Sequence, residues 1–268
     1  MHKRKYRLGL IGLGKMGSAI ARGAVVTDYL ERYEVCVFDV RDDIDRIANE
    51  ESFALMKSAK EVAENSDVVL LAIRPQDIDE VFKELKDVKI ECILSIVTGL
   101  SIKKIQEELN DVPVIRGMPN TPLQIKEGAT ALCMSDNCCA DDYDFVYKLF
   151  SSMGETRTIR EDQMNEIITV HGSTPAYFYY FIELLMEDAK KRGIDEDVAR
   201  ALLVQTMIGS GKLLQQDRNK PIQDYIEEVC SKGGATYEAI EVMRNSNLFD
   251  IFHDASDACI KRAEELGK

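Results

Sequence analysis

The chain has 268 residues, of which 45% are hydrophobic and 30% charged, a composition typical of a folded globular protein and not of a disordered or fibrous one. It carries 34 Lys and Arg against 47 Asp and Glu, and this net charge of −13 is repelled by nucleic-acid phosphates and anionic lipids. We therefore expect no nucleic acid and no membrane as partner, and the longest apolar run, 68–73, is too short to span a bilayer.

The first 160 residues alternate between strands and helices. Eight strands are predicted, at 8–11, 34–38, 53–56, 67–73, 90–96, 113–116, 128–134 and 155–159. Helices are predicted between them, at 18–25, 41–50, 58–65, 75–86, 101–109 and 141–152, with Ser101 as a cap. This alternation predicts an α/β fold with a doubly wound, mainly parallel, Rossmann-like sheet.

Beyond about residue 160 the strand signals stop and helical patterns follow. Pro175 is predicted to begin a helix that ends near Gly193, and its apolar stripe over 178–185 fits the core of a dimer as well as that of a monomer. A second long helix is predicted over 196–216, followed by two or three more. The sequence therefore predicts two domains, 1–160 with the sheet and 161–268 made of helices.

The cysteines and histidines show no spacing typical of a metal site or a disulfide framework. The seven cysteines are an odd number, none is spaced as a CxxC pair, and Cys138 directly precedes Cys139. We expect reduced thiols, no metal ion and a cytoplasmic protein. The basic start of the chain, residues 3–5 with Arg7, is expected to be a solvated tail, because an apolar strand follows too closely for a signal peptide.

A glycine-rich turn stands between the first strand and the first helix. Its residues are Gly12, Leu13, Gly14, Lys15, Met16 and Gly17. In this context Gly12 permits a tight turn, Gly14 lets a diphosphate approach bare backbone, and Gly17 lets the helix pack on the strand. The N–H groups that open the helix would face the phosphates. The turn therefore predicts that 1–160 binds a dinucleotide, whereas Met16, in place of Ser or Thr, excludes a nucleotide triphosphatase loop.

Two side chains at the end of the second strand bear on the choice of dinucleotide. Asp39 can bind both hydroxyls of an adenosine ribose, which favours NAD because a 2′-phosphate would be repelled. Arg41 has the opposite effect, since it can pair with a 2′-phosphate or lie on the adenine. The sequence leaves both NADP and NAD open.

Several separated motifs resemble the pyrroline-5-carboxylate reductase family over nearly the whole chain. They are residues 11–20 around the glycine turn, Ala72-Ile73-Arg74-Pro75-Gln76, Arg116-Gly117-Met118-Pro119-Asn120-Thr121-Pro122, Pro175-Ala176-Tyr177 with Gln205-Thr206, and Ser231-Lys232-Gly233-Gly234-Ala235-Thr236. The resemblance implies a dinucleotide-binding domain followed by a helical dimerisation domain, and thus a homodimer or larger homo-oligomer. It also implies that Ala72, Ile73, Arg74 and Pro75 join the glycine turn in binding the cofactor.

The reaction that the resemblance implies is reduction of 1-pyrroline-5-carboxylate to L-proline by NAD(P)H. Because a protonated iminium can form in solution, the protein mainly has to hold donor and acceptor in contact. Ser231, Gly234, Ala235 and Thr236 are expected to bind the substrate carboxylate through N–H groups and the Thr236 hydroxyl, with Asn120 also at the substrate. Glu161 matches an acidic position that lies near the ring nitrogen in the family and would favour the charged iminium.

The chain departs from the family pattern at four positions: His171, Thr174 and Lys232 replace the usual serine, glycine and proline, and Ala59 replaces an asparagine that often contacts the cofactor. These departures leave two alternatives open. One is a reductase of a related cyclic imino acid, such as a six-membered ring. The other is a regulatory paralogue that binds the dinucleotide without turnover.

Overall fold

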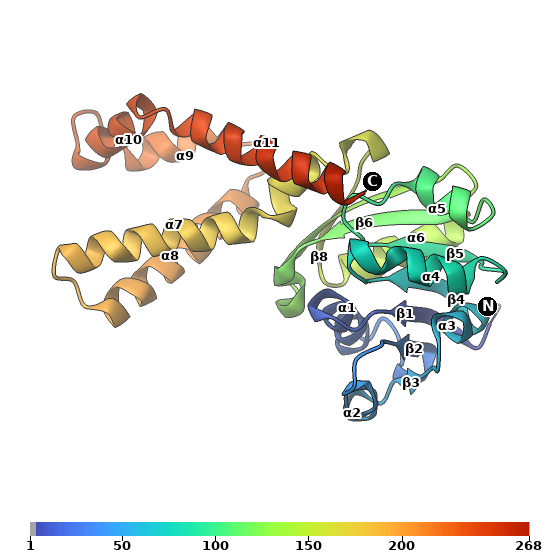
Figure 1. Ribbon diagram of the computed structural model, residues 1–268. Helices are drawn as coiled ribbons and strands as arrows, with labels where there is room; N and C mark the ends of the chain where they lie inside the picture. The colour runs from blue at the N-terminus through green and yellow to red at the C-terminus, as the bar shows by residue number, and fades with distance from the viewer. Residues whose placement is uncertain (1–3, 268) are drawn as a thin grey trace. The chain divides into compact units, whose positions relative to one another are not determined.

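The computed structural model describes residues 4–267 of the chain (Figure 1). These form two compact units, one of Met1–Pro175 with Cys259–Lys268 and one of Ala176–Ala258. The first unit holds the sheet, and the second is built from helices. The division into domains 1–160 and 161–268 stays a prediction, and the compact unit around the sheet also includes residues 161–175 and the end of the last helix.

An eight-stranded sheet forms the centre of the first unit, in the order β3-β2-β1-β4-β5-β6-β7-β8. The strands are β1 (Tyr6–Ile11), β2 (Val35–Phe38), β3 (Ala54–Leu55), β4 (Ser66–Leu71), β5 (Cys92–Ser95), β6 (Val114–Pro119), β7 (Gly128–Met134) and β8 (Gly154–Thr158). All neighbours pair in parallel except β6 and β7. The predicted Rossmann-like sheet is confirmed, and its order reverses between β1 and β4, where open α/β sheets bind ligands.

Helices cover both faces of this sheet. One face carries α1 (Lys15–Val26), α2 (Ile44–Glu51) and α6 (Ala140–Ser151), and the other carries α3 (Ala59–Asn65), α4 (Ile78–Leu85) and α5 (Ile102–Glu108). Along β4, Val68 and Leu70 pack into the first layer and Val69 and Leu71 into the second. Because both faces are buried, this central strand is apolar throughout, and its carboxyl end is held in register with its neighbours.

Local polar contacts decide where several helices begin. Ser101 caps α5 as predicted, since its hydroxyl accepts the N–H of Lys104 at 3.1 Å. The helix predicted from residue 41 begins at Ile44 instead, because the chain first turns around Asp39, whose carboxylate accepts the N–H of Arg41 at 3.0 Å. After β4, a 3₁₀ turn over Pro75–Asp77 precedes α4.

The basic start of the chain is packed against the sheet, so the prediction of a solvated tail is wrong for Arg4 and Arg7. The backbone N–H of Arg4 donates to Asp67 at 3.0 Å. Arg7 forms ion pairs with Asp67 at 3.4 Å and with Asp142 at 3.1 Å, and its guanidinium lies 4.0 Å from the centre of the Phe145 ring. Two carboxylates near the amino end of the sheet, which the sequence pattern could not place, hold these arginines; Lys3 lies outside the described residues.

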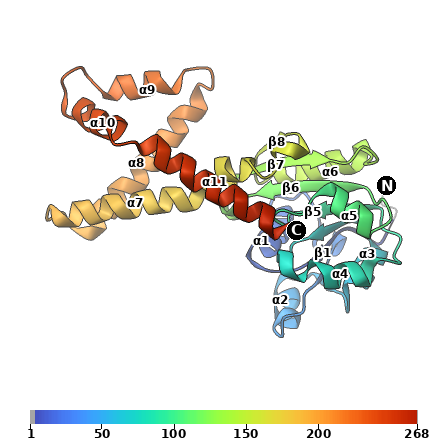
Figure 2. The same cartoon turned by 45° about the horizontal axis from the view of Figure 1, so that its top comes forward.

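The helices that follow the sheet match their predicted positions. They are α7 (Thr174–Lys191), α8 (Glu196–Gln216), α9 (Ile222–Val229), α10 (Ala235–Asn245) and α11 (Leu248–Leu266), as Figures 1 and 2 show. Gly193 follows the end of α7 with a φ of +77°, as expected for a helix stop. The apolar stripe of α7 does not form the core of a single chain, since Phe178 is 54% and Phe181 46% exposed.

Two chemical expectations can be compared with this fold. All seven cysteines lie among the described residues and none is joined in a disulfide, while their reduced state stays a prediction. Among the helices of residues 4–267, none is long and apolar enough to cross a membrane.

The tight packing of β1 against α3 gives a test of the fold. A Cβ at Gly9 would lie 2.2 Å from the Ser66 hydroxyl and 2.5 Å from Val62 Cγ1. We expect Gly9→Ala to lower the free energy of unfolding by about 1–3 kcal/mol through overpacking. Chemical denaturation measures this, with Gly14→Ala as control because a Cβ there meets no atom within 4 Å. Equal stability of the two variants would contradict the described packing.

Candidate active site

The glycine turn leaves bare backbone at the start of α1. Gly12 has a φ of +99°, and a Cβ on it would lie 2.6 Å from the Ala72 carbonyl oxygen. A Cβ on Gly17 would lie 2.2 Å from the Gly12 carbonyl oxygen, so this glycine allows the helix to approach the turn. Gly14, by contrast, faces open space and is the N-cap of α1, with no side chain capping the helix. The first N–H groups of α1 can therefore meet an anion, and the turn fits a dinucleotide diphosphate.

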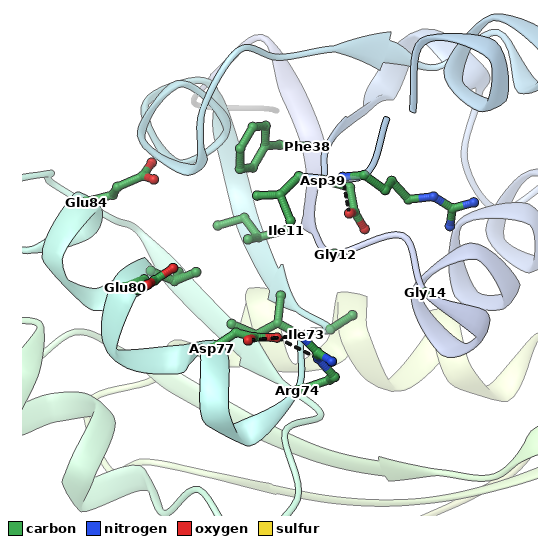
Figure 3. A pocket seen from close by; sticks show the side chains of 14 residues that line it. Ile11, Gly12, Gly14, Phe38, Asp39, Ile73, Arg74, Asp77, Glu80 and Glu84 are labelled. Carbon is green, nitrogen blue, oxygen red and sulfur yellow. Dashed lines mark hydrogen bonds and ion pairs between the residues drawn. The ribbon is translucent and has the colours of Figure 1, made fainter. Parts of the chain in front are cut away.

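A crevice of about 480 Å³ lies beside this turn, at the switch point of the sheet (Figure 3). Seven of the predicted cofactor residues line it: Gly12, Gly14, Asp39, Arg41, Ala72, Ile73 and Arg74. Leu13 belongs to the turn itself, Lys15 and Gly17 lie in the first turn of α1, and Pro75 follows Arg74 as the first residue of the 3₁₀ turn. The structure thus brings seven of the twelve predicted cofactor residues together around one crevice.

Asp39 joins the end of β2 to the glycine turn. One oxygen of its carboxylate accepts the N–H of Leu13 at 2.5 Å, and the other accepts the N–H of Arg41 at 3.0 Å. Figure 3 shows Asp39 on the same wall of the crevice as Gly12. The carboxylate is therefore fixed in place before any ligand binds.

Arg41 is paired within the chain. Its Nε and Nη2 donate to the two oxygens of Asp43 at 2.6 and 3.0 Å, and its Nη1 donates to the Leu13 carbonyl oxygen at 2.9 Å. The hydrogen bond from Arg41 lowers the pKa of Asp43 to about 2, so the pair stays ionised at neutral pH. All three nitrogens of this guanidinium thus have partners in the chain.

A second cavity, of about 280 Å³, lies in the same unit at the carboxyl ends of β4, β5 and β6. Its lining is mostly apolar and consists of Met16, Ala72, Ile73, Ile96, Thr98, Met118, Pro119, Ile168, Gly172 and Ser173. Ala72 and Ile73 line both spaces, so the second cavity adjoins the first at the switch point. A small apolar compartment next to a dinucleotide crevice is suited to a small organic substrate.

Asn120 and His171 connect segments that line this second cavity. Asn120 is buried, its amide nitrogen donates to the His171 carbonyl at 3.1 Å, and its amide oxygen accepts the N–H of Ala129 at 2.8 Å. The His171 Nε2 donates to the Met118 carbonyl oxygen at 2.6 Å. His171 belongs to a π-helical turn, Ile168–Gly172, that the sequence did not predict. The role of Asn120 at the substrate stays a prediction, and these contacts tie the end of β6 to the π turn.

Glu161 lies between β6 and α5. Its Oε1 accepts the N–H of Ile102, the first residue of α5, at 2.7 Å and a hydrogen bond from Arg116 at 2.9 Å. The Arg116 side chain is only 7% exposed, whereas that of Glu161 is 36% exposed. The Glu161 carboxylate thus balances the charge of the buried Arg116 guanidinium and caps α5. The predicted catalytic role of Glu161 stays a prediction.

The predicted carboxylate-binding residues gather at the start of α10, in the helical unit. Gly233 has a φ of +75°, and the N–H of Gly234 donates to the Ser231 carbonyl at 2.8 Å. Gly234 is the N-cap of α10 without a side-chain cap, so Ala235 and Thr236 begin the helix with N–H groups available to an anion. The structure brings Ser231, Gly234, Ala235 and Thr236 together within this unit.

Part of the lining of both spaces consists of residues that the sequence pattern did not identify. Asp77, Glu80 and Glu84 line the first crevice from α4 and the turn before it, but on a helix such acids resemble any solvated surface. Ile96 and Thr98 line the second cavity, and their place directly after a parallel strand was the signal that could have identified them. Within residues 4–267, no three His, Cys, Asp or Glu side chains are placed to hold a metal ion.

The chain is similar to known proteins over its whole length. One family model, described as pyrroline-5-carboxylate reductase dimerisation, matches residues 161–266, and another, described as NADP oxidoreductase coenzyme F420-dependent, matches 7–99. Pyrroline-5-carboxylate reductase of Glycine max is 31% identical over 265 residues, covering 97% of this chain and 96% of that protein. The Aquifex aeolicus enzyme of the same name is 32% identical over 263 residues, covering 98% of this chain and 96% of that protein.

Solved structures of proteins with the same activity in their names are also similar to this chain. Pyrroline carboxylate reductase of Plasmodium falciparum, with NADP bound, has a TM-score of 0.88 at 26% identity and covers 100% of both chains. A pyrroline-5-carboxylate reductase of Coxiella burnetii has a TM-score of 0.87 at 28% identity, covering 98% of this chain and 99% of that one.

The open space at Gly14 predicts the effect of one methyl group. We expect Gly14→Ala to weaken binding of NADH and NADPH at least about tenfold, because the Cβ would stand where the diphosphate meets the backbone. Nicotinamide fluorescence measures binding, and no Trp emission interferes because the chain has none. The melting temperature should fall only slightly, because alanine is a poorer N-cap than glycine. Unaltered affinity would argue against a diphosphate at this turn.

The contacts of Asn120 predict a loss of stability. Asn120→Ala would leave the Ala129 N–H and the His171 carbonyl without their partner, and we expect it to lower the free energy of unfolding by about 1–3 kcal/mol in the absence of substrate. Denaturant unfolding measures this against Asn49→Ala, an exposed site on α2. If Asn120 contacted only the substrate, both variants would be equally stable.

Proposed function

The chain belongs to the pyrroline-5-carboxylate reductase family, and we propose how its residues carry out that reaction. It reduces 1-pyrroline-5-carboxylate to L-proline with NAD(P)H as reductant, the last step of proline biosynthesis. The family match carries the assignment of the substrate. The glycine turn carries the assignment of the cofactor, because it offers uncapped N–H groups and open space beside Gly14 at the switch point of a Rossmann-like sheet.

The first unit binds and orients the cofactor. The N–H groups at the start of α1 would hold the diphosphate, and Asp39 would meet the adenosine ribose. Reduced nicotinamide, when bound, supplies a hydride to the C=N carbon of the pyrroline ring. Ala72 and Ile73, which line both the crevice and the second cavity, would hold the nicotinamide end toward the cavity that adjoins it.

The second cavity is suited by its size and mostly apolar lining to a small ring such as a pyrroline. Met118, Ile168 and Ile96 give this cavity an apolar wall, and Thr98 and Ser173 add hydroxyl groups. No strong general acid is needed when the ring nitrogen is already protonated, so the contribution of these residues is to keep donor and acceptor close. We propose that His171 and Asn120 keep this wall rigid through their contacts with β6.

Three further residues, Ala235, Thr236 and Glu161, complete the proposal. The N–H groups of Ala235 and Thr236, with the Thr236 hydroxyl, would bind the substrate carboxylate at the positive end of α10. We propose, from the resemblance to the family, that Glu161 lies near the ring nitrogen, where a carboxylate favours the iminium. Glu161 also accepts hydrogen bonds from Ile102 and Arg116, which fix β6 relative to the start of α5. These contacts support a second role for Glu161, as a positioning residue.

The chain is a homo-oligomer, as its match to the dimerisation model indicates. The exposed aromatic residues of α7, including Phe178, Tyr179 and Phe181, support a homodimer or a larger assembly formed through the helical domain. We also propose a cytoplasmic location, consistent with seven free thiols, and no nucleic acid among its partners, consistent with the acidic charge.

The direct test is an assay of 1-pyrroline-5-carboxylate with NADH and with NADPH, beside the corresponding six-membered cyclic imine. We expect oxidation of the nicotinamide that depends on the five-membered substrate and yields proline. A strong preference for the larger ring would reject the assigned substrate. Tight cofactor binding without any imine-dependent oxidation would instead favour a regulatory protein.

Thr236→Val tests the carboxylate site. The variant keeps the shape of the side chain and removes the hydroxyl, so we expect KM for the imino acid to rise about tenfold, with kcat changed less and cofactor affinity unaltered. Steady-state kinetics and nicotinamide fluorescence separate these effects. An unchanged kcat/KM would remove Thr236 from the substrate site.

A further inference from the structure

We propose that the adenosine end of the crevice selects NADH over NADPH, and that Asp39 and the Arg41–Asp43 ion pair together make the selection. The proposal rests on the proposed function, since it concerns the cofactor of that reductase. The sequence left the choice open, because Asp39 favours NADH whereas Arg41 favours NADPH. Three features of the structure decide between them: the charges that line the crevice, the partners of its arginines and the fixed position of Asp39.

The crevice has an excess of negative charge. Four carboxylates line it, those of Asp39, Asp77, Glu80 and Glu84, against the two guanidinium groups of Arg41 and Arg74. Figure 3 shows Asp39 beside the glycine turn, with Glu80 and Glu84 on the helix across the crevice. The 2′-phosphate of NADPH carries about −1.5 to −2 at neutral pH, whereas NADH has a neutral hydroxyl there. The lining therefore repels the one group that distinguishes the two cofactors.

Both arginines that line the crevice are already paired with acids of this chain. Arg74 donates to the two oxygens of Asp77 at 2.8 and 3.2 Å. Arg41 donates to both oxygens of Asp43 and also to the Leu13 carbonyl. To bind a 2′-phosphate bidentately through Nε and Nη2, Arg41 would have to give up its ion pair with Asp43. The charge of Arg41 is thus compensated in the free protein, and this residue attracts a 2′-phosphate less than an unpaired arginine would.

Asp39 is held where it can accept hydrogen bonds from a ribose. Its two oxygens accept the N–H groups of Leu13 and Arg41, which keeps the carboxylate at the edge of the crevice. A carboxylate has about four acceptor positions, so acceptor capacity remains for the 2′- and 3′-hydroxyls of NADH. A phosphate brings no such donors and places like charges together. The same carboxylate thus attracts one cofactor and repels the other.

Binding to the intact protein without imine substrate tests the proposal. We expect nicotinamide fluorescence to give a Kd for NADH at least about tenfold below that for NADPH at low salt, with the ratio narrowing as salt screens the repulsion. Adenosine 5′-monophosphate should raise the melting temperature more than adenosine 2′,5′-bisphosphate, which differs only by the 2′-phosphate. Equal or tighter binding of NADPH overturns the proposal.

Asp43→Ala tests the part assigned to the ion pair. Asp43 lies at the surface at the start of α2, and its side chain makes no capping hydrogen bond, so the fold should be kept. Releasing Arg41 should tighten NADPH binding about three- to tenfold and change NADH binding less than about twofold. Asp45→Ala is the matched control, since Asp45 is exposed on the same helix and its loss changes the net charge equally. An equal gain in both variants would show that Arg41 is not held back by Asp43.

The outcomes separate this proposal from the proposed function. Reduction of the pyrroline with NADPH preferred would keep the function and reject the selectivity. Selective NADH binding without reduction of any imine would keep the selectivity and reject the function. If neither nucleotide bound, the crevice would not be a dinucleotide site and both would fall.

Discussion

The site depends on a set of hydrogen bonds that continue the sheet into its loops. Beyond the last paired residues of the strands, the Gly12 N–H donates to the Phe38 carbonyl at 2.9 Å, and the Ala72 N–H donates to the Ile11 carbonyl at 2.9 Å. The Leu13 N–H then donates to Asp39. Three loops that are far apart in the sequence are thereby joined into one rigid edge. The positive φ of Gly12 turns the chain away from this edge, and α1 begins with its N–H groups uncovered.

The sequence was sufficient to predict this edge because the physical demands on it are local. A buried parallel strand has to be apolar on both faces, as 68–73 is, and a diphosphate turn requires glycine at positions that residue types alone reveal. The strands and the long helices of the chain follow from such patterns. The start of α2 does not follow from such a pattern. After the second strand, the carboxylate of Asp39 accepts the N–H of Arg41, and the helix therefore begins only at Ile44.

Contacts between distant residues could not be predicted in the same way. Arg4 and Arg7 looked like a solvated tail because nothing in their neighbourhood showed that Asp67 and Asp142 would face them. Likewise, the motif around Asn120 marked an important segment without showing that its amide would connect β7 to the π turn. The π turn has no periodic signal of its own, and it matters because it brings Ile168 and Ser173 to the second cavity. Polar partners across the fold are therefore the part of the site that needed a structure.

The helical unit gives a physical reason for assembly. Every residue from 176 to 258 is described, and among them only Ala199 is buried within the single chain. Ordering a residue costs about 1–2 kcal/mol of conformational entropy, which a unit with almost no apolar core cannot offset by itself. Large side chains such as Phe249, 78% exposed, and Leu202, 64% exposed, are therefore available to form a core with a second copy. Since Thr236 stands on α10 in this same unit, the order of the proposed carboxylate site depends on that association.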